Sequence, residues 1–340
     1  MNVFRYILRR VLFGAGVLVA VVTMTFVLSR SLGGNTVIAW LGKSASIHPE
    51  LARLYAEKYH LNDPIPVQYY YYILNLLQGN LGFSPSRGFE PVLQVIAETL
   101  PFTLQIAFCA FVISVVLGIA LGVLSAQYHH KPLDTCIRGF YLAGYSSPPF
   151  FVALILLILF AFIFHLLPSG GAFDIAVTPP TPITGLPIVD SLMEGNVSYF
   201  ASALQHLILP SLALALVTFG VLTRVLRSSL LEVMHANYIR TARAKGLDEN
   251  TVFFKHGLRN AMISVVTISS LMVTWLITGT IFVENIFAYP GMGQYLVTAL
   301  AAEDYPGILG VTMVFALVIV ITNLIADILY AVVDPQVRLG

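Results

Sequence analysis

The residues able to carry out chemistry are few, and their spacing matches no catalytic or metal site. Residues 42–44 (Gly-Lys-Ser) imitate the end of a phosphate-binding loop, but Val37 occupies the position of its required first glycine. The adjacent His129 and His130 have no further His or Cys near them, so a structural place beside an apolar segment is favoured over metal binding. The sequence has neither a His-Glu-x-x-His zinc pattern nor a Gly-x-Ser-x-Gly nucleophile turn. We therefore expect no catalytic, cofactor-binding or metal-binding residue.

Two cysteines and one carboxylate lie in or beside apolar segments. Cys109 sits inside an apolar run and Cys136 in a polar connection, so two small buried residues are expected rather than a disulfide scaffold. Asp327 is the one ionisable residue plainly within an apolar segment, with Asn323 one turn earlier. A carboxylate near the membrane surface, or paired with a neighbouring helix, is favoured there over a role in ion coupling.

The most informative polar residues follow one another from 237 to 260, within a basic segment that extends from 224 to 260. A short helix is predicted over 238–245, with Asn237 as its N-cap and Gly246 at its C-terminal cap. Asp248 then begins a second helix. Its first turn carries Asp248 and Glu249, and its last turn carries Lys255, His256 and Arg259, in agreement with the helix dipole.

Ala242 and Gly246 are one turn apart on the first of these helices, so they predict a smooth face that another protein's backbone could approach. Basic residues surround that face. Charge and spacing alone leave open whether this segment is a docking surface or a solvated loop, because inner loops of membrane proteins are generally basic.

The composition places these residues in a membrane protein. The chain of 340 residues is 57% hydrophobic and 10% charged, whereas soluble domains carry about 25% charged residues. The net charge of +1 argues against a nucleic-acid partner. A membrane helix needs roughly 20 apolar residues, and six segments are long enough: 11–28, 102–125, 140–167, 204–222, 262–283 and 308–333. We expect an all-α integral membrane fold with six transmembrane helices.

Three local features refine these spans. Residues 146–149 (Ser-Ser-Pro-Pro) predict a kink or break in the third. Gly118 and Gly122 predict close packing of the second against a neighbouring helix. The first follows basic residues but lacks a cleavage site, so it is interpreted as a retained span rather than a signal peptide.

The basic residues predict the orientation of the spans. With both termini inside, the inner segments hold 13 of the 18 Lys and Arg residues: Arg5, Arg9, Arg10, Lys131, Arg138, Arg224, Arg227, Arg240, Arg243, Lys245, Lys255, Arg259 and Arg338. The remaining five lie in a first outer segment, from about 30 to 100. Charges in so long a segment have little effect on the orientation of the spans. The outer segments 168–203 and 284–307 contain no Lys or Arg.

The outer segments differ in their predicted structure. In the first, helices are predicted over 48–60 and 68–77, which would form a small cap on the outer mouth. The second, rich in proline and glycine, is predicted to be a loop, and its sequon at 196–198 is a pattern that arises often by chance. The third is predicted to form a turn at 289–293 followed by a short amphipathic segment.

Eight motifs in order resemble one family, the ABC importer permeases for dipeptides, oligopeptides and nickel, and specifically the first of their two paired permease subunits. The resemblance covers nearly the whole chain through FRYILRR (4–10), LNDPIPVQY (61–69), GNLGFS (79–84), LPSG (167–170), HLILPSL (206–212), YIRTARAKGL (238–247), FVENIFAYPGMG (282–293) and DPQVRL (334–339).

The resemblance implies a type I importer permease in which the loop 224–260 docks into a groove on an ATPase subunit. The general docking motif, aligned on Gly246, retains only Ala242, Gly246 and Leu258 in this chain, while Thr-Ala-Arg-Ala-Lys-Gly resembles the form of the peptide subfamily. The implied docking residues are Tyr238, Arg240, Thr241, Ala242, Arg243, Ala244, Lys245, Gly246, Leu247 and Leu258.

The same resemblance implies the domain organisation and the partners. Residues 1–100 would form the first span and the extracellular cap, and residues 101–340 the core permease domain. The implied partners are a second homologous permease, two ATPase subunits that bind ATP and Mg, an extracellular binding protein and the lipid bilayer of a prokaryotic plasma membrane. Peptides are the expected substrate, with oligosaccharides or nickel as alternatives. A stand-alone ion-coupled carrier is the alternative of another class.

Overall fold

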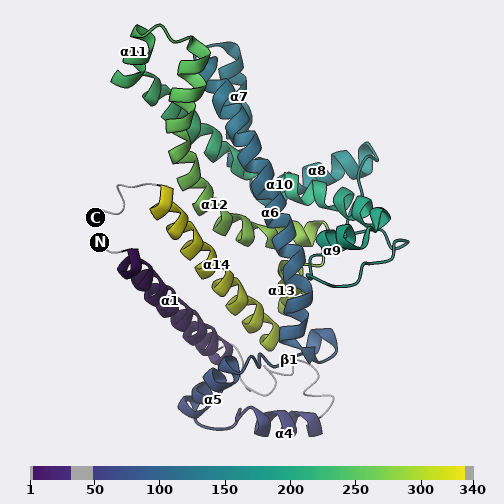
Figure 1. The fold of residues 1–340 in the computed structure, drawn as a ribbon. Helices are drawn as coiled ribbons and strands as arrows, with labels where there is room; N and C mark the ends of the chain where they lie inside the picture. The colour runs from purple at the N-terminus through teal and green to yellow at the C-terminus, as the bar shows by residue number, and fades with distance from the viewer. Residues whose placement is uncertain (1–2, 32–48, 334–340) are drawn as a thin grey trace.

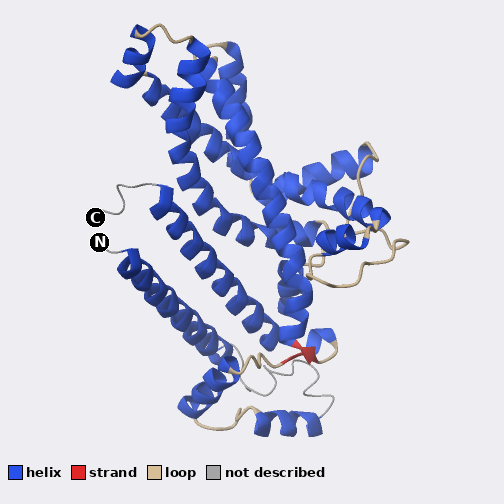
Figure 2. Ribbon diagram, in the orientation of Figure 1, coloured by secondary structure: helices blue, strands red, loops and turns tan. Residues whose placement is uncertain are grey.

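The computed structural model describes residues 3–31 and 49–333 and consists almost entirely of helices (Figure 1). The predictions for residues 42–44, His48 and the motif at 334–339 lie outside these residues, as does the side chain of Asp327. The helices are α1 Val3–Ser31, α4 Pro49–Lys58, α5 Ile65–Leu77, η1 Pro85–Arg87, α6 Val92–Gln127, α7 Pro132–Ser146, α8 Pro149–Leu156, η2 Leu157–Ile163, α9 Pro187–Glu194, α10 Val197–Met234, α11 Asn237–Ala244, η3 Thr251–Leu258, α12 Arg259–Ile286, α13 Met292–Ala301 and α14 Tyr305–Val333. Within the described residues, the strands are β1 Phe83–Ser84 and β2 Glu90–Pro91, which pair antiparallel (Figure 2).

Five helices in the described part of the chain are long and apolar enough to cross a membrane: α1, α6, α10, the continuous η3–α12 helix and α14. The predicted third span is instead a broken helix, because α7 and the α8–η2 helix meet at an angle of 109°. The break follows from Pro148 and Pro149, which cannot donate the hydrogen bonds that would continue α7. The predicted interruption is confirmed, and the count reaches six only if this bent pair is one span.

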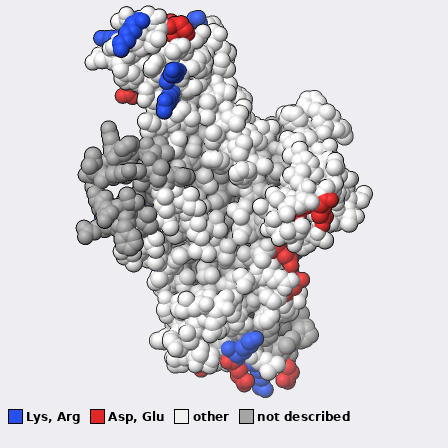
Figure 3. Space-filling view, viewed as in Figure 1, with Lys and Arg blue, Asp and Glu red and all other residues white. Residues whose placement is uncertain are grey.

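A wide apolar surface separates two charged ends of the molecule. On the face shown in Figure 3, Lys and Arg side chains gather at the end that carries α11 and again at the end that carries α4. Between these ends the long helices expose large apolar side chains, including Leu12 at 64%, Phe108 at 67% and Leu271 at 62%. Such a surface is stable only against lipid or another protein, which agrees with a multi-pass membrane protein.

The helix α10 lies at the centre of the bundle and packs against α6, α7 and α12, whereas α1 packs against α14 at the periphery (Figure 1). Glycines allow α6 and α10 to approach closely. A methyl group placed on Gly118 would lie 2.6 Å from Leu222 Cβ, and one on Gly122 would lie 3.0 Å from Leu226 Cβ. The predicted close packing at this glycine pair is confirmed, with α10 as its partner.

Gly118→Ala is therefore expected to lower the free energy of unfolding by about 1–3 kcal/mol, because the added methyl group overlaps Leu222 in a packed contact. Thermal unfolding of the detergent-solubilised protein measures this effect. Gly139→Ala in α7 is the matched control, since no atom lies within 4 Å of the added group. It should leave stability unchanged or raise it by up to about 1 kcal/mol. Equal unfolding temperatures for the two variants would contradict the close α6–α10 contact.

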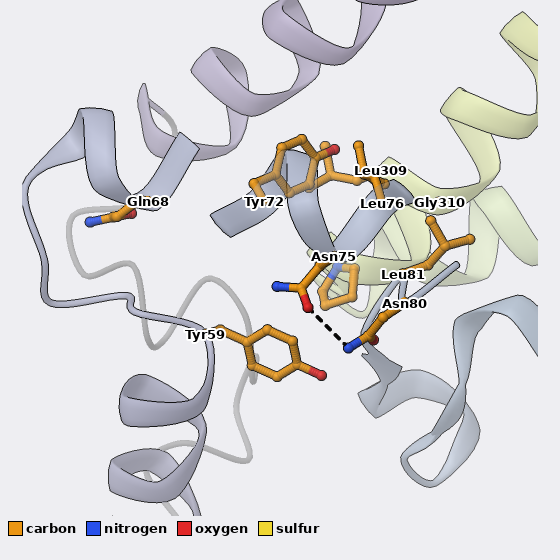
Figure 4. Close-up of a pocket in the computed structure, with 10 residues that line it drawn as sticks. Tyr59, Gln68, Tyr72, Asn75, Leu76, Asn80, Leu81, Leu309 and Gly310 are labelled. Carbon is orange, nitrogen blue, oxygen red and sulfur yellow. Dashed lines mark hydrogen bonds between the residues drawn. The ribbon is translucent and has the colours of Figure 1, made fainter. Parts of the chain in front are cut away.

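The predicted cap helices are present as α4 and α5. Thr23 Oγ1 of α1 and the Tyr69 hydroxyl of α5 are hydrogen-bonded at 2.7 Å. A cavity of about 20 Å³, with room for about one water molecule, lies between α5, the residue Tyr59 just after α4, and the start of α14 (Figure 4). Asn75 and Asn80, joined by a 3.3 Å hydrogen bond, line it together with Gly310 of α14. The cap is thus attached to both peripheral helices, α1 and α14.

The segment 168–203 was predicted to be a loop, and that prediction holds for residues 168–186 but is wrong for residues 187–203. It contains α9 and the start of α10. Pro187 occupies the first turn of α9, and Asn196 caps α10 by accepting a 3.0 Å hydrogen bond from the Tyr199 amide. Burial would raise the pKa of Asp190 in α9, but hydrogen bonds from Thr184 and neighbouring amides outweigh it and hold that pKa below its ordinary value. The sequence analysis missed these two helix starts because it interpreted the proline-rich composition as a loop.

Candidate functional site

The basic segment 224–260 lies at one end of the bundle, where the short helix α11 connects the end of α10 to η3 (Figure 1). The opposite end of the molecule carries α4 and α5. Ile239 and Ala242 on α11 pack with Val252 on η3, and all three side chains are buried. This small core holds α11 against the two long helices that flank it.

The inward position of Ala242 overturns one expectation. Ala242 is 8% exposed, so it does not form a common exposed face with Gly246. The helical period explains the difference, because Ala242 lies three residues after Ile239 and therefore on the same buried side of the helix. Its small side chain allows α11 to lie close to η3 and is not available to a partner.

Gly246 ends α11 with the backbone geometry that the sequence predicts. Its φ is +77°, and the amides of Gly246 and Leu247 donate to the carbonyls of Arg243 at 2.9 Å and Ala242 at 3.4 Å. This pair of hydrogen bonds is the Schellman arrangement, which favours glycine at that position. The predicted N-cap is wrong by one residue, because Ala236 precedes the helix and Asn237 is its first residue.

The second helix begins as predicted but does not end in the loop. Asp248 Oδ2 accepts a 2.9 Å hydrogen bond from the Thr251 amide, which caps the new helix. The helix then continues through the π-helical segment η3 into α12 as far as Ile286. Lys255, His256 and Arg259 therefore lie inside a long helix, and their predicted place in a last turn is wrong.

Eight of the ten predicted docking residues share one exposed region, which we call the α11 surface: Tyr238, Arg240, Thr241, Arg243, Ala244, Lys245, Gly246 and Leu247. Arg243 also forms an exposed ion pair with Glu249, with Nε–Oε1 and Nη2–Oε2 distances of 2.8 and 3.1 Å, across the Gly246 turn. Ala242 is buried, and Leu258 is half-buried against the main core. The structure thus brings eight residues together and separates two.

A buried ion pair that the sequence reasoning missed connects the helices next to this surface. Asp134, at the start of α7, accepts hydrogen bonds from Arg227 Nε at 2.9 Å, Arg227 Nη2 at 2.8 Å and Ser125 Oγ at 2.5 Å. Arg227 Nη2 also donates to His129 Nδ1 at 2.9 Å. These contacts tie α6 and α7 to α10, the helix that leads into α11. An acidic residue just after Lys131-Pro132, in the first turn of a helix, was the signal that could have indicated it.

A second buried carboxylate explains the motif at 282–293. Glu284 is fully buried in α12 and accepts hydrogen bonds from the Gly293 amide at 2.6 Å, the Gln294 amide at 3.1 Å and Thr103 Oγ1 at 2.8 Å. It therefore caps α13 and joins α6, α12 and α13. A methyl group on Gly291 would lie 2.3 Å from its carboxyl group, which explains the glycine there.

Comparisons with known proteins agree with this architecture. The family model for the binding-protein-dependent transport system inner membrane component matches residues 118–339, and the model for the N-terminal part of such membrane components matches residues 3–107. The chain is 38% identical to the probable D,D-dipeptide transport system permease protein DdpB of Escherichia coli K12, over 99% of this chain and 98% of that protein. It is 37% identical to the oligopeptide transport system permease protein AppB of Bacillus subtilis, over 98% of this chain and 99% of that protein.

The fold is also found in a solved structure. The inward-facing MetNI methionine ABC transporter contains a chain that matches with a TM-score of 0.53 and 14% sequence identity, covering 72% of this chain and 99% of that one. At this identity the likeness concerns the fold alone. Since the family models match almost from end to end and the identity to curated permeases reaches 38%, the chain belongs to the family of inner membrane components of binding-protein-dependent transport systems.

Proposed function

We propose that this chain is one of two paired permease subunits of a prokaryotic ATP-driven peptide importer, and that its α11 surface docks to an ATPase subunit. The observation that carries the proposal is the α11 surface itself: eight exposed residues, five on α11 and three in the turn that follows it, on a helix held by its own buried core. A protruding element that is rigid before it binds suits a partner that must push and pull on it.

The connections of α11 suit the transmission of force. In the chain, α10 comes just before α11, and the continuous η3–α12 helix follows α11 after the Gly246 turn. Both are long helices of the bundle. When two ATPases close on ATP, the docked α11 would move, and the flanking helices would move with it as rigid bodies. ATP and Mg would be bound by the ATPase subunits.

The proposal includes an orientation and a set of partners. The α11 surface and both termini would be cytoplasmic in a prokaryotic plasma membrane, and a binding protein would rest on the α4–α5 cap. The second permease would be a homologue of this chain. Residues 1–100 and 101–340 would act as a peripheral and a core part, although α6 runs across residue 100. Peptides are favoured because the relatives are named as dipeptide and oligopeptide permeases, with oligosaccharides or nickel as alternatives.

Reconstitution tests this function. Proteoliposomes containing this chain, the second permease and the ATPases, with the binding protein outside, should accumulate a labelled oligopeptide only when ATP is inside. Removal of ion gradients should not change the uptake. Uptake by this chain alone, driven by an ion gradient, would establish the stand-alone carrier instead.

Arg243→Gln is expected to weaken association with the ATPase about tenfold, because it removes a positive charge from the centre of the α11 surface. The exposed Arg243–Glu249 pair contributes about 0.2–1 kcal/mol to stability, so the unfolding temperature should change little. Co-purification at graded ATPase concentrations measures the association.

Glu249→Gln is the matched control for this prediction. It breaks the same ion pair but leaves Arg243 charged, so association should stay close to that of the native chain. If both variants weaken association equally, the geometry of the turn matters rather than a contact of Arg243.

A further inference from the structure

The parts of α10 and α12 nearest to α11 form one unit with it. Ser229 Oγ of α10 donates a 3.0 Å hydrogen bond to Ser264 Oγ of α12. A methyl group on Gly257 of η3 would lie 2.9 Å from Met234 Sδ at the end of α10, so these two segments are also in close contact. We call residues 227–264 the α11 unit, because these contacts make the adjoining ends of both long helices move with α11.

Arg227 attaches the α11 unit to α6 and α7. Its Nε and Nη2 atoms donate to the two carboxylate oxygens of Asp134 at 2.9 and 2.8 Å, and two such parallel hydrogen bonds fix orientation as well as distance. The Asp134 side chain is 1% exposed and that of Arg227 17% exposed, so water does not readily replace the contact. In the described part of the chain, every hydrogen bond between the α11 unit and α6, α7 or the turn between them comes from Arg227.

Apolar packing at the same level does not fix orientation in this way. Leu226, just before the α11 unit, lies against Gly122 of α6. Such packing is non-directional, and packed helices can slide past one another by small amounts. A bidentate hydrogen bond, by contrast, weakens steeply when its angles change. The contact between Arg227 and Asp134 therefore holds α10 at one angle to α6 and α7.

We infer that Arg227 and Asp134 are positioning residues for the coupling of ATP hydrolysis to transport. Their contact makes α6 and α7 move with the α11 unit, so that a displacement of α11 by the ATPase reaches the broken helix α7–α8 as well as α10 and α12. The inference rests on the proposed function and adds the step that carries the movement sideways into the bundle. Without the contact, the ATPase would still dock and hydrolyse ATP, but α10 would slide against its neighbours.

The variants that test this step all lie around Asp134. Arg227→Gln removes the contact to α10 and leaves Asp134 with its Ser125 and His130 donors, at 2.5 and 3.3 Å. Arg138→Gln is the matched control, because Arg138 Nε also lies 3.8 Å from Asp134 Oδ1 but the polar contacts of Arg138 stay within α7. Arg227→Lys keeps the charge without the planar fork. Asp134→Asn/Arg227→Gln breaks the contact without leaving a buried unpaired charge, which covers the case that Arg227→Gln assembles poorly.

Proteoliposomes with the complete importer receive binding protein and a labelled oligopeptide outside and ATP inside. The measured quantity is the number of peptides taken up per ATP hydrolysed, and co-purification of the ATPase measures assembly. Arg227→Gln and the double variant are expected to lower this ratio about tenfold, within the range by which single mutations change coupling between distant sites. Co-purification should stay at the native level. Arg227→Lys should recover part of the ratio, and Arg138→Gln should keep all of it.

Two outcomes would overturn the inference while leaving the proposed function intact. If uptake, ATP hydrolysis and co-purification of the double variant stayed native or fell together, so that the ratio was unchanged, the pair would have no part in coupling. An equal fall of the ratio in Arg138→Gln would show that the charge around Asp134 matters rather than the connection to α10. By contrast, absence of ATP-dependent uptake with the native chain would contradict the proposed function itself.

Discussion

Gly246→Asp should abolish ATP-driven uptake and detach the ATPase subunits, while the permease itself remains folded. Gly246 is exposed, and nothing lies within 4 Å of the position that its side chain would occupy. The strain of an L-residue at φ +77° costs roughly 1–2 kcal/mol, which a packed bundle tolerates. In a docked complex the added carboxylate would be buried against the ATPase without a partner, at a cost of about 2–5 kcal/mol. Association should therefore weaken by about thirtyfold or more.

Gly195→Asp is the matched control for this prediction. Gly195 ends α9 with φ +71° and also has no atom within 4 Å of its added side chain. The two variants thus carry the same backbone strain and the same new charge, at different places. Co-purification of the ATPase and peptide uptake should be lost only in Gly246→Asp. If Gly246→Asp retained both ATPase co-purification and peptide uptake, the α11 surface would not be the docking interface.

The parts of the fold that could be predicted from the sequence are those set by solvent and by local backbone chemistry. The long spans follow from runs of apolar residues, because lipid imposes a minimum length on every helix that crosses it. The break between α7 and α8 follows from Pro148 and Pro149. The turn after α11 follows from Gly246, since its backbone geometry favours glycine whatever surrounds it.

The parts that could not be predicted depend on contacts between distant segments. Ala242 was expected on an exposed face. It is buried because α11 folds back on η3 and forms the small core with Val252, a contact that the sequence spacing does not indicate. Asp134 and Arg227 are far apart in the sequence, and their ion pair depends on the packing of α7 against α10. In the predicted docking segment, burial within the fold rather than sequence spacing decides which side chains are exposed.

The buried Glu284 shows the same limit at the other end of the bundle. The sequence analysis gave it no role, because the fifth predicted span ended at residue 283 and Glu284 began the outer segment 284–307. The structure instead makes it the acceptor for two amides of α13 and for Thr103 of α6. A carboxylate at a helix N-terminus also interacts favourably with the helix dipole. Glu284 thus acts as the centre of a three-helix junction.

Glu284→Ala should consequently lower the free energy of unfolding by about 3 kcal/mol or more, because it leaves three buried donors without an acceptor. The Gly293 and Gln294 amides and the Thr103 hydroxyl would lose their acceptor, and each buried unsatisfied group costs about 1–3 kcal/mol. Thermal unfolding in detergent measures the change. Glu98→Ala on the exposed side of α6 is the control and should shift stability by less than about 0.5 kcal/mol.

Gly293→Ala provides an independent approach to the same junction. Its added methyl group would lie 2.5 Å from Ile281 Cα and 2.8 Å from Glu284 Oε2, so α13 would have to move away from α12. Because the carboxylate then loses its amide donors, this variant should be destabilised by a similar amount even though Glu284 is present. The double variant Glu284→Ala/Gly293→Ala should be less destabilised than the sum of the two, since both changes break one network. Additive effects would show that the two residues stabilise the protein separately and do not belong to one network.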